Sequence, residues 1–433
     1  MTPVEIGILG SVVMLLLLVC SMPVAVAMIV TGVVGYAAIT SWPAALSVLS
    51  GDLYSTFANY NLTVIPLFVL MGQVAFHAGI SGRLFATANN WMSAMRGGLA
   101  MATVGACAAF SAVCGSGPAT AATMAAVALP EMKKHKYDHA LAAGTVASGG
   151  SLGLLIPPSV VFIVYGIQTE QSIGKLFIAG IVPGLLIAVL FCVMIYVRCL
   201  LNPSLAPPAV SVPWGVRFKS LLGVLETLLL FAFVMGGMFA GWFTPTEAAA
   251  MGALGSIIIA VMGGNCSFKM LWRAAQETVR TSCMVLVIVA GATIFGHFLA
   301  VTGMPTQFAT WLTGLPFPPM ATVSLIILFF FFVGLFVDSL ALILLTVPIF
   351  YPVVRQLGFD PIWFGVIIVV MTQMGVITPP VGINVYVVSG IDRSIPLQTV
   401  FRGAVPFLLV LIAVCALLMV FPQIATWLPS LAR

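Results

Sequence analysis

The chain has 433 residues, of which 61% are hydrophobic and only 6% are charged, and its mean hydropathy is +1.19. A soluble domain carries about a quarter of its residues as charged side chains, so this composition excludes a soluble globular protein. The formal net charge of +5 comes from loop lysines and arginines, which is an ordinary topology signal in a membrane protein and no argument for nucleic-acid binding.

Long apolar segments predict an all-α polytopic membrane protein, because one spanning helix needs about 20 such residues. The segments are continuous and do not alternate as the strands of a β-barrel would. No cleavable signal peptide is expected, because the N-terminus MTPVEIGILG has no basic start. The apolar segments lie near residues 5–40, 62–80, 98–130, 139–166, 176–200, 221–241, 246–263, 281–302, 320–336, 339–354, 362–390 and 404–428.

A proline-rich segment at residues 203–219 is predicted to link two halves, 1–202 and 220–433. Its four prolines forbid a continuous helix. In the second half, the charges of residues 267–282 recur at three- and four-residue spacing. This pattern predicts an amphipathic helix along the membrane interface, with a simple loop helix as the alternative.

The two halves share an unusual pattern at an offset of 222 positions. The segments that begin at Pro130 and Pro352 align without a gap, and each interrupts an apolar stretch with Gly-x-x-x-Pro-Pro. The aligned identities are Pro130 with Pro352, Asp138 with Asp360, Gly153 with Gly375, Pro157 with Pro379 and Pro158 with Pro380. Internal repeats that carry Gly/Pro-broken apolar segments are typical of secondary transporters.

Each proline doublet is predicted to form the tip of a re-entrant hairpin, at about residues 139–166 and 362–390. Three lysines in the loop at 133–136 outweigh the single Arg355 of the equivalent loop, which favours an inverted repeat. Carbonyls freed at a broken helix suit Na⁺, and a helix N-terminus suits an anionic group of the substrate. Candidate substrate contacts are Ser159, Gln373 and Asn384.

A second pair of breaks occurs at residues 115–120, GSGPAT, and 334–342, GLFVDSLAL. Asp338 lies between apolar stretches, where an ionisable side chain is functional by default, although a buried helix cap is the alternative. Glu247 is predicted to complete a helix cap in the sequence TPTE. His77 and His297 are expected to make ordinary hydrogen bonds.

Enzyme chemistry finds little support in the sequence. There is no His-Glu-x-x-His and no Walker loop, so ATP hydrolysis is not expected to drive this chain. The eight cysteines are scattered without metal-ligand or redox spacing.

The chain resembles the large membrane subunit, the DctM-like M subunit, of tripartite ATP-independent periplasmic (TRAP) transporters. The resemblance rests on the segment from GSGPATAATMAAVALPEMKKHKYDH to LLIPPS, on GWFTPTEAAA, on GLFVDSLALILLTVPIFYP and on GVITPPVGINVYVVSGI. It implies an elevator-type transporter of the bacterial inner membrane that imports organic acids with Na⁺. It also implies two partners, which are a small four-helix membrane subunit and a periplasmic substrate-binding protein.

The resemblance further implies two Na⁺ sites. The first would comprise Ser111, Cys114, Ser116, Gly153, Ile156 and Pro158, and the second Gly334, Asp338, Gly375, Thr378 and Val381. Position 114 departs from the serine that is usual in the family, and a thiol is a poor Na⁺ ligand.

Three other functions remain open at this stage. The nearest is a stand-alone inverted-repeat carboxylate or gluconate symporter that needs no binding protein. A more distant one is a membrane-embedded enzyme with Asp338 as its catalytic acid, and a third is a channel.

Overall fold

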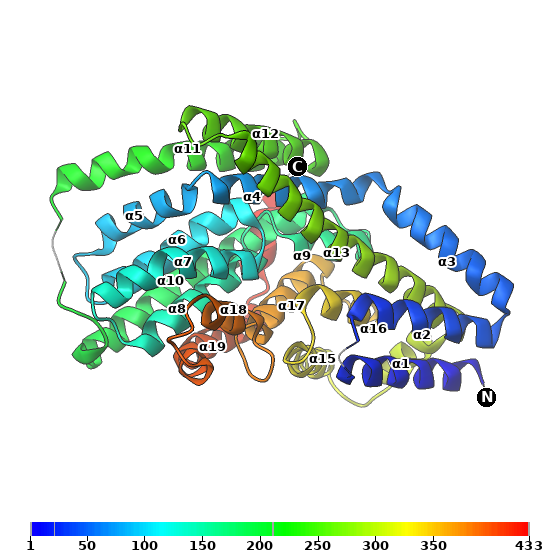
Figure 1. Ribbon diagram of the computed structural model, residues 1–433. Coiled ribbons are helices and arrows are strands. Elements are labelled where there is room, and N and C mark those ends of the chain that lie inside the picture. The colour runs from blue at the N-terminus through cyan, green and yellow to red at the C-terminus, as the bar shows by residue number, and fades with distance from the viewer. Residues whose placement is uncertain (1, 21, 210–211, 432–433) are drawn as a thin grey trace.

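The computed structural model describes residues 2–20, 22–209 and 212–431, and within them the chain is helical with no β-strand (Figure 1). Of these helices, seven are long and apolar enough to cross a membrane. The prediction of an all-α multi-pass membrane protein is confirmed.

The helices of the first half are α1 (Pro3–Val19), α2 (Val24–Ile39), α3 (Trp42–Phe57), α4 (Val64–His77), α5 (Ile80–Met92), α6 (Gly98–Cys114), α7 (Gly117–Lys134), α8 (His139–Ser151), α9 (Val160–Thr169) and α10 (Ile173–Leu201). Those of the second half are α11 (Trp214–Phe239), α12 (Pro245–Met262), α13 (Phe268–Thr302), α14 (Met304–Thr313), α15 (Pro319–Gly334), α16 (Ser339–Gln356), α17 (Pro361–Gly375), α18 (Ile383–Ile391), α19 (Leu397–Val420) and α20 (Gln423–Leu431). Short 3₁₀ turns are η1 (Tyr60–Thr63), η2 (Leu152–Leu154) and η3 (Pro203–Leu205).

The internal repeat extends over almost the whole chain. The helices α5 to α10 recur in order as α14 to α19, about 222 positions later, and α1 and α2 recur as α11 and α12. The packing is reciprocal as well. α4 packs on α12 and α13 packs on α2, while α9 packs on α16 and α18 packs on α7. Each half therefore completes the core of the other.

Two helical hairpins are present, but they are α6–α7 and α15–α16. In each pair the two helices pack against one another. At the open end of the first hairpin, the Leu99 amide at the start of α6 donates to the Tyr137 hydroxyl just after α7, at 3.2 Å. The chain reverses at Gly115, which has a φ of +65°, a conformation that glycine adopts readily.

The segments with the proline doublets are broken helices that cross the bundle. α8 does not pack along α9, nor α17 along α18. The end of α7, just before α8, lies beside the end of α18, because Lys133 pairs with Asp392. The end of α9 lies beside the start of α17, because the Tyr165 hydroxyl donates to the Pro361 carbonyl at 2.6 Å. Each broken helix thus runs from one end of the bundle to the other.

The prediction of hairpins at 139–166 and 362–390 is therefore wrong, because the hairpins are the helix pairs just before these segments, α6–α7 and α15–α16. Two prolines remove amide donors and open a helix, but the helix then resumes across the bundle, whereas a reversal needs a turn such as that at Gly115. Both doublets contain a cis peptide bond. The broken helices run in opposite directions, which makes the repeat inverted, and Figure 1 shows α18 next to α7 and α8.

Two sequence boundaries also shift. The predicted linker 203–219 begins with η3 and ends inside α11, which starts at Trp214, and its residues 210–211 lie outside the described residues. The predicted amphipathic segment 267–282 is helical but forms the first half of α13. No glycine or proline lies between residues 268 and 290 to end the helix there.

Capping residues set several helix starts. Asp138 and Asp360, which are aligned in the two repeats, cap α8 and α17 through their side chains. Thr244 and Glu247 form a capping box at α12, in which the Thr244 amide donates to the Glu247 carboxylate at 2.8 Å. The predicted role of Glu247 as a cap is confirmed.

Candidate ion and substrate site

The tip of the first hairpin lies against the break in α8–α9. Gly115 approaches the Pro158 carbonyl so closely that a methyl group there would overlap it. The Val160 amide at the start of α9 donates to the Gly115 carbonyl at 3.4 Å. Only glycine fits this contact, which brings the GSGPAT segment and the first proline doublet together.

The residues of the first predicted Na⁺ site surround this contact. Ser111 is fully buried, and its hydroxyl has no hydrogen-bond partner among the described residues. Gly153 lies under the Ser116 carbonyl, since a Cβ built on it would be 2.8 Å from that oxygen. Ile156 instead turns its side chain toward Gly184 and can contribute only backbone atoms. Cys114 packs its backbone against Gly72 of α4.

Thr120 belongs to the same group of oxygens, although the sequence analysis did not select it. Its hydroxyl is buried, and no described residue forms a hydrogen bond with it. A Cβ built on Gly153 would be 3.0 Å from the Thr120 hydroxyl oxygen. The final threonine of GSGPAT was the available signal, since it lies one helical turn beyond Ser116 and on the same side of α7.

The second predicted Na⁺ site lies at the other hairpin tip. A methyl group on Gly375 would overlap the Gly334 carbonyl, and the Val381 amide donates to the Leu335 carbonyl at 3.3 Å. The Thr378 hydroxyl donates to the Met374 carbonyl at 2.6 Å. This tip and the second break form the counterpart of the first site, with backbone carbonyls as its main oxygen atoms.

Asp338 caps α16. Its carboxylate accepts a hydrogen bond from the Leu340 amide at 3.1 Å. The same residue lines the central cavity, so it both caps the helix and faces an open space.

The central cavity has a volume of about 290 Å³ and lies between the hairpin tips and the helices α4 and α13. Polar side chains from both sides reach it. Ser116, Asp338 and Ser339 come from the hairpins, while Gln73 and Thr281 come from α4 and α13. The sequence analysis missed Gln73 and Thr281, because neither lies in a repeated motif.

Three helices begin at this cavity. Its lining includes the second residue of α7 (Pro118) and the first residues of α9 (Val160) and α16 (Ser339). The start of a helix carries partial positive charge and unpaired amide donors. Among the described residues, no lysine or arginine lines the cavity, so the partial positive charges beside Asp338 come from helix ends.

The three predicted substrate residues lie around this region but outside the cavity lining. The Ser159 side chain caps α9 and donates to the Leu154 carbonyl at 2.5 Å. The Asn384 amide donates to the Ala147 carbonyl at 3.0 Å and so ties α18 to α8. Gln373 is fully buried in α17, and both polar atoms of its side chain lack a partner. A contact of these residues with substrate stays a prediction.

Both histidines singled out from the sequence pair with carboxylates. The His77 ring is 3.1 Å from Glu277, and the His297 ring is 2.7 Å from Asp52. The two pairs join α4 and α3 to α13.

Inverted repeats, paired hairpins and broken helices around a central cavity define a multi-pass membrane permease. The described structure is similar to the Alcanivorax borkumensis YdaH transporter, with a TM-score of 0.66, 18% identity and coverage of 88% of this chain and 89% of that one. This likeness shows the fold.

The family description "Tripartite ATP-independent periplasmic transporter, DctM component" matches residues 11–424. A C4-dicarboxylate TRAP transporter large permease protein from Pseudomonas aeruginosa is 37% identical over 390 residues, which cover 90% of each chain. A sialic acid TRAP transporter large permease protein from Vibrio cholerae is 36% identical, covering 86% of this chain and 87% of that protein. An ectoine/5-hydroxyectoine TRAP transporter large permease protein from Ruegeria pomeroyi is 30% identical and covers 97% of each chain.

The chain belongs to the DctM family of TRAP transporter large membrane subunits. It is a multi-pass protein of the bacterial inner membrane.

Proposed function

We propose that this chain is the Na⁺-coupled importing subunit for a small organic anion, a carboxylate or a sugar acid. The observation that carries the proposal is the start of three helices at one cavity that no described lysine or arginine lines. Partial positive charge from helix ends attracts an anion weakly enough to allow release. The relatives' substrates, which include C4-dicarboxylates and sialic acid, agree with this class.

Na⁺ suits the two places, here called crossings, where a hairpin tip lies against the break in a broken helix. The breaks leave backbone carbonyls without helical partners, and the first site adds the unpaired hydroxyls of Ser111 and Thr120. Hard oxygen donors of this kind suit Na⁺. Because both crossings border the region of the cavity, bound Na⁺ would pull the tips and breaks together beside the substrate. Each net charge that moves inward across 100 mV contributes about 2.3 kcal/mol to accumulation.

Transport follows an elevator motion in this proposal. A transport unit (α6–α10 and α15–α20) carries the sites, and a scaffold unit (α1–α5 and α11–α14) stays fixed. The cavity lies where the two units meet, between the hairpin tips on one side and α4 and α13 on the other. A sliding motion of the transport unit would expose it to each side of the membrane in turn.

Two partners complete the proposed importer. A small four-helix membrane subunit would join the scaffold unit, and a periplasmic binding protein would deliver the substrate. The stand-alone symporter is the second candidate, and it differs from the proposed importer only in that it needs no binding protein. A membrane-embedded enzyme is disfavoured, because Asp338 serves as a helix cap. The relatives of the chain are, in addition, transporter permeases.

Uptake by proteoliposomes tests the proposal. The vesicles contain this chain and its small subunit, with the binding protein outside and succinate or sialic acid as labelled substrate. We expect uptake with an inward Na⁺ gradient, none when K⁺ replaces Na⁺, and none without the binding protein. Equal uptake in Na⁺ and K⁺ would reject the coupling, and full uptake without the binding protein would favour the stand-alone symporter.

A further inference from the structure

A second and larger cavity opens on the membrane side of the bundle. It has a volume of about 530 Å³ and lies between α5, α6, α10 and α11. Apart from Cys192 and Thr227, its lining is made of apolar side chains and glycine. The groove follows α10 from Ile181 to Val193, which is about 18 Å at 1.5 Å per residue. This "membrane groove" has the length and character of a site for an acyl chain.

The lipid phase is the natural source of an occupant. Leu185, Val189 and Val193 line the groove and are at least half exposed, at 56%, 58% and 50%. A cavity lined by apolar groups does not hold water. In a bilayer, hydrocarbon therefore fills it.

Two arginines, each with one buried guanidinium nitrogen that has no described hydrogen-bond partner, lie at one end of the membrane groove. Arg217 is only 9% exposed, its Nε has no hydrogen-bond partner, and its guanidinium lies 4.8 Å from the centre of the Trp214 ring. Arg198 on α10 has a buried, unpartnered Nη1. Within the described residues no carboxylate is within ion-pair distance of either arginine. A buried guanidinium without a partner is costly unless an anion pairs with it.

Contacts place both arginines at the same end of the groove. The Trp91 indole donates to the Arg217 carbonyl at 3.2 Å, and Trp91 directly precedes Met92, which lines the groove. Arg198 is five residues beyond Val193 on α10, beside the turn between α5 and α6, where Gly97 packs against Cys199. Tryptophan and arginine at the end of an apolar groove are typical of the lipid headgroup level.

We propose that the membrane groove binds one anionic phospholipid of the bilayer, with an acyl chain along α10 and its phosphate between Arg217 and Arg198. This end of the bundle also carries the basic loop with Lys133, because α6 begins beside Tyr137 just after that loop. Basic loops remain cytoplasmic. The headgroup therefore belongs to the cytoplasmic leaflet, where anionic lipids attract arginine.

The bound chain would touch both units of the permease. α5 and α11 belong to the scaffold unit, whereas α6 and α10 belong to the transport unit. The lining also includes Ile156 and Pro157, which are part of the first helix break. The proposed lipid thus fills the boundary next to the first ion site, and its binding does not depend on the transported substrate or on Na⁺.

Native mass spectrometry of the full chain tests the proposal. The chain is delipidated in detergent and then exposed to equal amounts of phosphatidylglycerol and phosphatidylcholine. We expect one retained phosphatidylglycerol per chain. R217Q and R198Q should each lower the preference for the anionic lipid about fivefold, which corresponds to about 1 kcal/mol per arginine near the headgroup. K219Q, at an exposed position of α11, is the matched control and should keep the preference.

A substitution inside the groove tests the acyl-chain site separately. A109F fills the groove and should abolish retention of both lipids, while L222F, at a 66% exposed position on α11, should not. Full lipid retention by A109F, or an unchanged preference in both arginine variants, would overturn the proposal. Loss of the lipid when the small subunit is co-purified would also overturn it, in favour of a partner helix in the groove.

Discussion

Thr120 provides a sharp test of the first proposed Na⁺ site. Its hydroxyl is buried next to Gly153 and has no hydrogen-bond partner in the protein. T120V keeps the branched shape of the side chain and replaces the hydroxyl with a methyl group. If the hydroxyl binds Na⁺, the loss of one polar contact to a charged group costs about 1.5 kcal/mol. This energy corresponds to a rise of about tenfold in the Na⁺ concentration for half-maximal uptake.

Stability without Na⁺ separates this role from a structural one. Removing an unpaired hydroxyl leaves no orphaned partner, so T120V should unfold at the wild-type temperature or slightly above it. T145V is the matched control, because the Thr145 hydroxyl donates to the Leu141 carbonyl at 2.7 Å on α8. It should lose about 1 kcal/mol of stability and keep the wild-type Na⁺ dependence. An unchanged Na⁺ requirement in T120V would refute the assignment.

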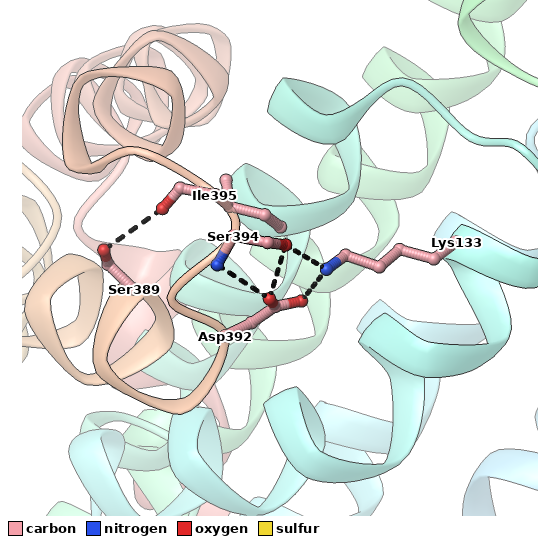
Figure 2. A network of polar contacts seen from close by, with 5 residues as sticks. All are labelled: Lys133, Ser389, Asp392, Ser394 and Ile395. Atoms are coloured by element: carbon pink, nitrogen blue, oxygen red, sulfur yellow. Dashed lines mark hydrogen bonds and ion pairs between the residues drawn. The ribbon is translucent and has the colours of Figure 1, made fainter.

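Three further predictions follow from the fold. G115A should abolish uptake, because its methyl group meets the carbonyl of the first proline doublet at a φ of +65°; wild-type uptake would contradict that contact. Partial burial raises the pKa of Asp392, but hydrogen bonds from Lys133 and Ser394 outweigh this effect, and the pKa is lower than the ordinary value (Figure 2). The stability from this pair is present above the unfolded pKa of about 3.9 and is lost as the pH falls through the folded value; D392N should lose it at every pH, measured by thermal unfolding. Cysteines introduced at His135 and Gln171 should react with an impermeant maleimide from opposite sides of the membrane. Labelling of both from one side would support the hairpin predicted at 139–166 and contradict the broken spanning helix.

The sequence reveals the repeat and its breaks because both depend on local chemistry. Asp138 and Asp360 cap equivalent helices, and the Gly and Pro residues interrupt the helices where expected. The path of the chain after each interruption is not local. A proline doublet indicates where a helix is interrupted. That the helix resumes across the bundle depends on packing against α7 and α16.

The candidate site was only partly accessible from the sequence for the same reason. The hairpin tips and breaks share motifs, so their residues were selected together before their contacts were known. Gln73 and Thr281 reach the cavity from helices without such a motif. Their role depends on how the scaffold unit packs against the tips, which no spacing along the chain records.

The two repeats are tied together at both ends and in the middle, and this bears on how the proposed transport unit moves. At one end Lys133 pairs with Asp392, and at the other the Tyr165 hydroxyl bonds the Pro361 carbonyl. Between them, the Asn384 amide joins the second broken helix to the first. Each tie crosses from one repeat to the other, yet all of them stay inside the transport unit. Sliding the repeats past each other would break these contacts, whereas the proposed motion along α4 and α13, where the central cavity lies, would keep them.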